Sequence, residues 1–245
     1  MWLVVSVIVV MALLISAALW WLVRVSRRYR ATDWGKSWLN VLDGVNRWFC
    51  VVYHRLDYQT IPLPETGCGI VAANHVSGLD PLLLAAASAR PLRFMIAREQ
   101  YQRFGLQWLF RAAGCIPVDR ESRPERALRE ALRALACGEV VALFPHGTIH
   151  LESDPPRKLK SGATRLAHIS DCTIYPVRLQ GIAGQGKVIS AVLLRGHPHL
   201  RIAPAMRCEK ENTHACLERL AAILEGRDLD ARTLDHDSQE LNRAG

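Results

Sequence analysis

The sequence predicts an α/β fold in which a mixed or largely parallel sheet is flanked by helices, preceded by an N-terminal membrane-anchoring helix and an interfacial helix. Half of the 245 residues are hydrophobic, which is enough for a sizeable core. Short apolar runs alternate with helical stretches, as strands and helices do in this fold class. The runs cover residues 69–73, 93–97, 115–118, 140–144, 173–179 and 188–194, and the helical stretches cover 80–88, 99–112, 124–137 and 160–170.

The N-terminal segment from Trp2 to Val23 carries no charged side chain. It is long enough to cross a hydrocarbon core of ~30 Å. Trp2 stands at one end and Trp20 and Trp21 at the other, which is typical of aromatic belts at the two interfaces. A cleavable signal peptide has its charges before the apolar run and small residues after it, and this segment has neither. We therefore expect an uncleaved anchor, either spanning the bilayer or lying within one leaflet.

Basic residues follow the apolar segment directly. Seven Lys and Arg fall between Arg24 and Arg55, opposed only by Asp33 and Asp43, and the whole chain has a formal net charge of +8. This distribution indicates a collar at an anionic lipid surface. The positive-inside rule then predicts a cell inner membrane protein with its globular domain on the cytoplasmic side. Nucleic acid is not an expected partner, because the soluble half has no recognition motif.

A second membrane element is predicted over residues 34–53. Apolar side chains recur there at helical spacing, which favours an interfacial helix, and the alternative is a helix that faces the core of the globular domain. The apolar positions are Trp38, Val41, Leu42, Val45, Trp48, Phe49 and Val52.

Three segments are predicted along the chain. Residues 1–60 form the anchor and interfacial helix, and residues 61–225 form the globular domain, which begins near Ile61 after a linker punctuated by prolines. Pro124 and Gly138 bracket one helix of this domain, and a short helix over 215–224 closes it. Residues 226–245 are polar and are expected to be disordered.

The most informative motif is Asn74-His75-Val76-Ser77-Gly78-Leu79-Asp80. It follows an apolar run and precedes a proline, so we expect His75 at the carboxyl end of a strand, where α/β sheets build their sites. Asp80 can hold one imidazole nitrogen and leave the other to take a proton, as a general base does. The alternative is an ordinary turn with a capping aspartate. No nucleophile motif accompanies the pair, which favours a base that activates a substrate hydroxyl.

Three further segments follow in order. They are Gly114-Cys115-Ile116-Pro117-Val118-Asp119-Arg120, Val140 to Thr148, and Ile174-Tyr175-Pro176-Val177, with Leu159-Lys160-Ser161-Gly162-Ala163 between the last two. From about Gly69 to Val177, this set resembles the glycerolipid acyltransferase family, in particular the 1-acyl-glycerol-3-phosphate (lysophosphatidic acid) acyltransferases. The first block matches the family's N-H-x-S-x-x-D, and the second resembles its G-x-x-x-x-D-R.

The resemblance implies a glycerol-3-phosphate acyltransferase-like fold and a membrane-bound O-acyltransferase, with residues 61–225 as its catalytic domain. His75 deprotonates the free hydroxyl of a lysophospholipid, which attacks a thioester donor, acyl-CoA or acyl carrier protein, and Asp80 orients His75. No cofactor or metal is needed, since the thioester is already activated. Backbone amides around Gly147 and Thr148 are candidates for the oxyanion or a phosphate. The expected substrate-binding residues are Asn74, Ser77, Asp119, Arg120, Pro145, His146, Gly147, Thr148 and Lys160.

The third block departs from the family pattern. The family reads F-P-E-G-T-R, and this chain has His146 in place of the glutamate and Ile149 in place of the arginine. Arg120, Arg157, Lys158 and Lys160 are the candidate replacements for the missing cation. The expected acceptor is 1-acyl-glycerol-3-phosphate, giving phosphatidic acid. The alternatives are another lysolipid, such as a lyso-aminolipid, and a non-catalytic membrane lipid-binding protein.

The seven cysteines are odd in number and show no C-x-x-C spacing. We expect free thiols in a reducing cytoplasm, with Cys115 as a small core residue and not a nucleophile. His146 and His150 stand four residues apart, but on a strand and turn, where helical zinc-pair geometry is lacking. No metal site is therefore predicted.

Overall fold

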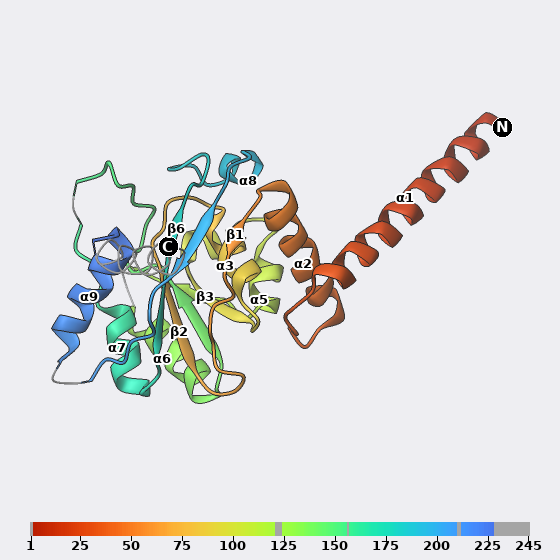
Figure 1. The fold of residues 1–245 in the computed structure, drawn as a ribbon. Coiled ribbons are helices and arrows are strands. Elements are labelled where there is room, and N and C mark those ends of the chain that lie inside the picture. The colour runs from red at the N-terminus through yellow and green to blue at the C-terminus, as the bar shows by residue number, and fades with distance from the viewer. Residues whose placement is uncertain (1, 121–123, 156, 210–211, 228–245) are drawn as a thin grey trace, which may run out of the picture.

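The computed structural model describes residues 2–120, 124–155, 157–209 and 212–227. A seven-stranded sheet lies at its centre, with helices on both sides and one long helix projecting from the N-terminal end (Figure 1). The predicted tail over 226–245 lies outside the described residues from position 228 onward.

The sheet has the strand order β1-β7-β6-β2-β5-β3-β4. All neighbouring strands are parallel except β6 and β7, which are antiparallel, so the mixed, largely parallel sheet predicted above is confirmed. The strands are β1 (Asp57–Tyr58), β2 (Gly69–Ala73), β3 (Leu92–Ala97), β4 (Ile116–Val118), β5 (Val140–Leu143), β6 (Ile174–Gln180) and β7 (His199–Ile202).

Helices cover both faces of the sheet, because side chains of a strand point alternately to opposite sides. In β2, Ile70 and Ala72 join one buried cluster with α6, α7 and α9, while Val71 and Ala73 join a second cluster with α3. Every residue of β2 is buried. The helices of the catalytic domain are α3 (Asp80–Ala87), α4 (Arg98–Tyr101), α5 (Gln107–Ala112), α6 (Pro124–Ala136), α7 (Gly162–Ser170), α8 (Ser190–Leu193) and α9 (Thr213–Glu225).

Three local predictions differ from the structure. The helix expected over 99–112 is divided into α4 and α5, with Gly105 at φ +80° between them. The run 188–194 is not a strand: it holds the short helix α8, and it exposes Val188, Ile189, Leu193 and Leu194 while Ala191 is buried. The strand that completes the sheet is β7, which begins at His199 and lies outside the six predicted strands.

The catalytic sheet also begins before the predicted boundary at Ile61. Strand β1 pairs Asp57 with His199 and Tyr58 with Leu200, which joins it to the edge of the sheet. A two-residue strand is too short to give a periodic pattern, so its pairing depends on β7, far along the chain.

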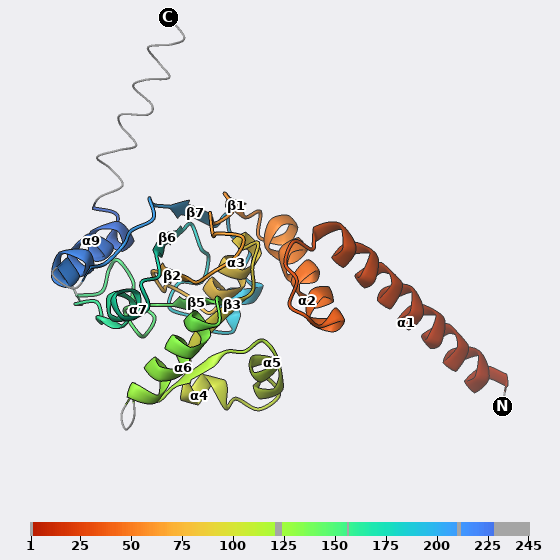
Figure 2. The same cartoon turned by 90° about the horizontal axis from the view of Figure 1, so that it is seen from below.

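Helix α1 (Trp2–Tyr29) projects away from the globular domain and packs only near its carboxyl end, against α2 (Ser37–Trp48) (Figure 2). By length and composition it is the one described helix able to cross a membrane, and its most apolar stretch is not buried in the protein. The two helices approach closely at Gly44, where an added Cβ would collide with the Ser26 backbone.

Helix α2 turns its polar side inward. Asn40, Asp43 and Arg47 are buried, while Trp38 and Leu42 are exposed. The Arg47 guanidinium donates to the Ser88 carbonyl oxygen at 2.8 Å and also to that of Ala86. Within the apolar stripe, Trp38 and Leu42 are exposed, which favours the interfacial helix over the core-facing alternative, while Phe49 packs against a buried cluster of the domain. The last predicted turns form a short π-helix, η1 (Phe49–Tyr53).

The prediction of seven free thiols is wrong for four of them. The structure joins Cys68 to Cys172 and Cys208 to Cys216, with Cα–Cα separations of 5.7 and 5.8 Å. Ile70 pairs with Ile174 in the β2–β6 ladder. Cys68 and Cys172 each stand two residues before this pair, and the ladder therefore brings them together. Only strand pairing brings residues 104 positions apart together. Cys50, Cys115 and Cys137 are free.

Candidate active site

The candidate active site lies at the carboxyl ends of β2 and β5. These strands are parallel neighbours, with Ala72 paired to Leu143, so the segments that follow them come out side by side. The first is the catalytic turn, residues 74–80, and the second is the third-block loop, residues 144–150. The two are joined directly, since the His150 N–H donates to the His75 carbonyl oxygen at 2.7 Å.

The pair predicted from the sequence is formed. His75 Nδ1 lies 2.7 Å from Asp80 Oδ2, and the imidazole is one-fifth exposed while Asp80 is fully buried. A carboxylate can only accept, so Nδ1 carries the proton and the neutral ring presents Nε2 as an acceptor. No described residue hydrogen-bonds to Nε2, and the His75 ring stacks on Phe144 with centroids 4.2 Å apart.

Asp80 is held by the turn it closes. Its Oδ2 accepts from the Val76 and Ser77 amides at 2.7 and 2.9 Å, and its Oδ1 accepts from the Ser77 hydroxyl at 2.6 Å. The aspartate thus caps the turn and orients the histidine at once. The two interpretations that the sequence left open, a capping aspartate and a catalytic one, are compatible.

Asn74 and Ser77, expected to bind substrate, have their polar atoms engaged within the protein. The Asn74 side chain bonds the Leu179 backbone in both directions, at 2.9 and 2.7 Å, and fixes the turn to β6. Ser77 is fully buried and also accepts from the Leu79 amide at 3.1 Å. Both residues therefore position the turn, and their contact with substrate stays a prediction.

Gly78 brings a second segment against the catalytic turn. Its N–H donates to the Lys187 carbonyl oxygen at 3.0 Å, and the Gly186 N–H donates to that of Val76 at 2.9 Å. A Cβ at Gly78 would collide with the Val188 backbone. The segment 184–188 therefore lies directly on the turn, and the sequence contained no signal for this contact.

In the third-block loop, Gly147 lies beside Lys160, another of the predicted substrate-binding residues. Gly147 adopts φ +78°, and a Cβ there would lie 2.9 Å from Lys160 Nζ, so the lysine ammonium crosses this position closely. The Lys160 backbone N–H also donates to the carbonyl oxygen of the buried Pro145 at 3.0 Å. The Gly147 N–H is engaged with the Phe144 carbonyl oxygen at 2.9 Å, whereas no described residue accepts the Thr148 N–H. Of the two predicted oxyanion donors, only Thr148 is available.

His146 is an unusual member of this loop. It is 3% exposed, and neither ring nitrogen has a hydrogen-bond partner among the described residues. Its ring stacks on His150 with centroids 4.7 Å apart. Burial, with a smaller repulsion from His150, lowers the pKa of His146 to about 4, so the ring is neutral near pH 7.

The candidate cations divide into two groups. Lys160 lies over Gly147, and Arg157 donates to the Thr148 hydroxyl at 2.7 Å. Arg120 is exposed after β4, three strand positions from β2 and so roughly 14 Å away across the sheet. Asp119 beside it pairs with Arg98 at 2.9 Å. The structure therefore brings Lys160 and Arg157 to the third-block loop and leaves the second block at the sheet edge.

Known proteins resemble this chain over the part that contains the candidate active site. A family profile described as Acyltransferase matches residues 55–180, which include the whole catalytic turn and third-block loop. The chain belongs to the acyltransferase family. In this acyltransferase, the candidate general base His75 lies just after the carboxyl end of β2.

Individual relatives agree with this assignment. The 1-acyl-sn-glycerol-3-phosphate acyltransferase of Bacillus subtilis is 25% identical over 185 residues, covering 75% of this chain and 89% of the relative. A probable 1-acyl-sn-glycerol-3-phosphate acyltransferase of Mycoplasma pneumoniae is 32% identical over 122 residues, covering 47% of this chain and 45% of the relative. The crystal structure of a lysophosphatidic acid acyltransferase from Thermotoga maritima has the same fold, with a TM-score of 0.63 at 21% identity, covering 82% of this chain and 84% of that one.

Two features of the acyltransferase site were absent from the sequence predictions. The Phe144 ring supports His75, and the 184–188 segment supports the turn. Phe144 is the first residue of the third block, and its contact with His75 could have been predicted from the adjacency of the two strands. Among the described residues, no three His, Cys, Asp or Glu side chains gather as a metal site would require. Burial raises the pKa of the Cys115 thiol to about 11, as befits a core residue.

Proposed function

We propose that this acyltransferase transfers a fatty acyl chain from a thioester, acyl-CoA or acyl carrier protein, to the free hydroxyl of 1-acyl-glycerol-3-phosphate, giving phosphatidic acid. The observation that carries the proposal is the His75–Asp80 pair, with Nδ1 held and Nε2 open. The acceptor is proposed because the B. subtilis and M. pneumoniae relatives carry that substrate in their names.

The geometry supports a direct transfer. His75 Nε2 takes the proton of the acceptor hydroxyl as the oxygen attacks the thioester carbonyl carbon. Asp80 stabilises the imidazolium that forms, as an aspartate does in a hydrolase triad. The Thr148 N–H is the donor we assign to the developing oxyanion. Collapse of the intermediate breaks the C–S bond, and the imidazolium returns its proton to the departing thiolate.

We assign the acceptor phosphate to Lys160 and Arg157. Both are exposed and border the third-block loop, where Ile149 cannot supply a cation. Arg120 is the family-like alternative, but it lies at the sheet edge. A charge-assisted hydrogen bond to phosphate is worth ~1.5–3 kcal/mol, so loss of one raises the acceptor KM by about tenfold or more.

A transfer assay with a panel of lysolipid acceptors tests this assignment. With 1-acyl-glycerol-3-phosphate, Lys160→Gln and Arg157→Gln should each raise the acceptor KM about tenfold, whereas Lys158→Gln and Arg120→Gln should leave it within about twofold. A rise with Arg120→Gln alone would move the phosphate to the second block. A KM unaffected by any of the four would remove the proposed phosphate site.

The same panel tests the alternatives. His146 and Ile149 leave the third-block loop without the family's carboxylate and guanidinium, which favours a different lysolipid, such as a lyso-aminolipid, as the second candidate. Acylation of that lipid with an inert 1-acyl-glycerol-3-phosphate would establish it. No transfer to any acceptor would favour a non-catalytic lipid-binding protein.

We further propose that α1 anchors the protein in the cell inner membrane, with the catalytic domain on the cytoplasmic side. The apolar surface of α1 and the basic residues from Arg24 onward support this orientation. A cytoplasmic active site would have direct access to acyl-CoA or acyl carrier protein.

A further inference from the structure

We propose that one side of α6 is a docking surface for the acyl donor, and that its occupant is a small carrier protein presenting a row of carboxylates. This surface, the α6 arginine face, consists of Arg126, Arg129 and Arg133. The inference rests on the thioester transfer proposed above. It specifies which partner delivers the thioester and where on the domain that partner binds.

The three arginines share one stripe of α6. They stand at helical positions i, i+3 and i+7, which lie on the same side of a helix, and all three are exposed. Along the helix axis the row from Arg126 to Arg133 extends ~10 Å. The opposite side of the helix packs into the buried cluster under the sheet through Ala127, Ala131, Ala134 and Leu135.

Neighbouring carboxylates do not neutralise this row. Glu125 and Glu130 flank the stripe, but within the described part of the chain neither forms an ion pair with any of the three arginines. Asp119, at the end of β4, is paired with Arg98 at 2.9 Å. Residues 100–118, which lead through α5 to β4, contain no aspartate or glutamate. The face therefore presents a positive potential to solvent.

The pattern of side chains favours a protein over a lipid surface or a free nucleotide. No large hydrophobic side chain is exposed on the described part of α6, whereas helices that lie in lipid combine cations with apolar residues. The phosphates of coenzyme A are concentrated at one end of a small molecule. A row of arginines ~10 Å long instead complements carboxylates at the same spacing on a facing helix.

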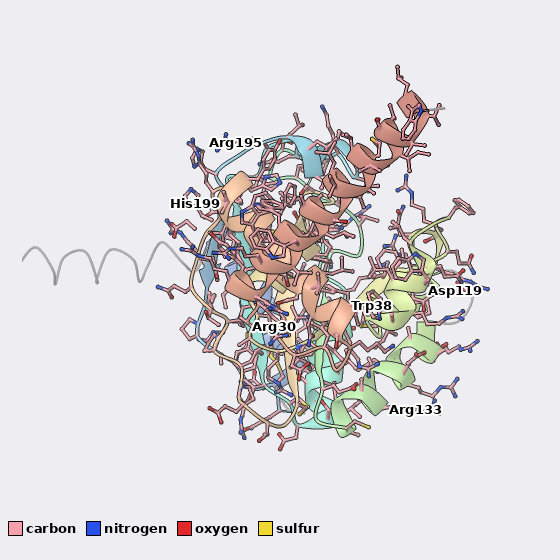
Figure 3. All side chains as sticks on the ribbon, turned by 90° about the vertical axis from the view of Figure 1, so that its right-hand side faces the viewer. Arg30, Trp38, Asp119, Arg133, Arg195 and His199 are labelled. Carbon is pink, nitrogen blue, oxygen red and sulfur yellow. A yellow bond between two sulfur atoms is a disulfide. The ribbon has the colours of Figure 1, made fainter. Side chains whose placement is uncertain are left out.

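The α6 arginine face is also set apart from the membrane anchor. Helix α5 lies between α6 and α2 in both Figure 1 and Figure 2. In Figure 3, Asp119 and Arg133 mark the two ends of the face, and α6 runs between them. A soluble carrier protein can therefore approach α6 while α1 remains in the bilayer.

A carrier at this position can reach the base. Strands β2, β5, β3 and β4 are parallel, so their carboxyl ends lie at one edge of the sheet, where His75 follows β2 and Arg120 follows β4. The separation of β4 from β2 is roughly 14 Å. A phosphopantetheine arm is about as long as four to five extended residues, roughly 15 Å. With the phosphate of the arm at Arg120, the thioester can lie at His75.

Binding of a labelled carrier protein tests the docking without catalysis. Fluorescence anisotropy would follow fluorescein-labelled palmitoyl acyl carrier protein titrated with full-length enzyme in detergent. The test variant combines Arg126→Gln, Arg129→Gln and Arg133→Gln. The control variant removes three charges from exposed positions on α7, β7 and α9, by Arg165→Gln, Arg201→Gln and Arg219→Gln.

At low ionic strength we expect the test variant to raise Kd at least about tenfold and the control to change it by less than about twofold. Added salt should weaken binding by the wild type more than by the test variant. Equal Kd values in all three proteins, or equal weakening in the two variants, would overturn the docking surface.

Transfer assays with two donors complete the test. The ratio of kcat/KM for palmitoyl acyl carrier protein to that for palmitoyl-CoA should fall about tenfold in the test variant and stay constant in the control. An equal loss with both donors would overturn carrier docking, since a change of fold or active site affects both. Carrier binding by the wild type without transfer from either donor would leave the docking surface standing and remove the proposed function.

Discussion

The carboxylate of Asp80 closes the turn and also holds the imidazole of His75. Its buried carboxylate accepts from the backbone amides of Val76 and Ser77 and from His75, so the group that closes the turn also orients the base. A substitution there changes charge, hydrogen bonding and imidazole tautomer together. The effects of the two proposed catalytic residues should therefore be measured separately.

His75→Ala should abolish transfer to within background, and Asp80→Asn should lower kcat by roughly 10³-fold, since the amide no longer holds the Nδ1–H tautomer. Initial rates with a saturating thioester donor measure both effects. Far-ultraviolet circular dichroism and thermal unfolding control for loss of fold. Turnover near that of the wild type in folded His75→Ala would rule out the base mechanism.

Stability should fall in acid because of His146. Its pKa is about 4 in the folded protein and about 6.5 in an unfolded chain, so the unfolded state binds more protons between these values. Stability is therefore full above pH 7 and declines as pH falls through 6.5 toward 4. The loss from this residue by pH 5 is roughly 1–2 kcal/mol.

Thermal unfolding in detergent at pH 7 and pH 5 checks this prediction. His146→Gln should show a smaller drop in Tm between the two pH values than the wild type. His214→Gln, at an exposed position on α9, should show the wild-type drop. Equal drops in all three proteins would contradict the assignment to His146.

Among the elements, the catalytic turn is closely constrained by the neighbouring 184–188 segment. Gly78→Ala should push the turn away from the Val188 backbone, lower Tm and reduce kcat by at least about tenfold, because the His75 orientation depends on that turn. Gly162→Ala is the matched control, since the nearest atom to its new Cβ is 4.0 Å away and the site is helical. A Gly78→Ala protein with normal activity would mean that the 184–188 contact is not required.

For the whole molecule, the anchor predicts fractionation behaviour. The most apolar stretch of helix α1 is not buried in the protein, so its hydrophobic surface should hold the chain in lipid. We expect the protein to remain in the membrane fraction after both high-salt and carbonate washes, and intact mass to include the N-terminal segment. Release by carbonate would contradict spanning, and a mature chain beginning near residue 24 would contradict an uncleaved anchor.

The cysteine pairs predict a thiol count. Without reductant, native protein should alkylate only at Cys137, because Cys50 and Cys115 are buried and burial raises their thiol pKa values to about 12 and about 11. Denatured protein should show three reactive thiols without reductant and seven after reduction. Seven reactive thiols without reductant would show that the pairs stay reduced, as in a cytoplasm.

Local patterns determined much of this protein. Five of the six predicted strands form, because a run of buried apolar residues between turns is itself the strand signal. The His75–Asp80 pair forms for the same reason: the two residues belong to one turn, and their contact needs only five residues of chain. The N-terminal helix, whose residues 2–23 carry no charged side chain, could equally be predicted from composition.

Tertiary structure decided what depends on residues far apart in the chain. Strand pairing joined Cys68 to Cys172, and close packing placed Val188 on Gly78 and Lys160 over Gly147. Helix α2 shows the same limit, since periodicity identifies its apolar stripe but only the buried contacts of Arg47 reveal that the polar side faces inward. A sequence pattern specifies which side chains share a face, whereas the direction of that face is set by the surfaces available to cover it.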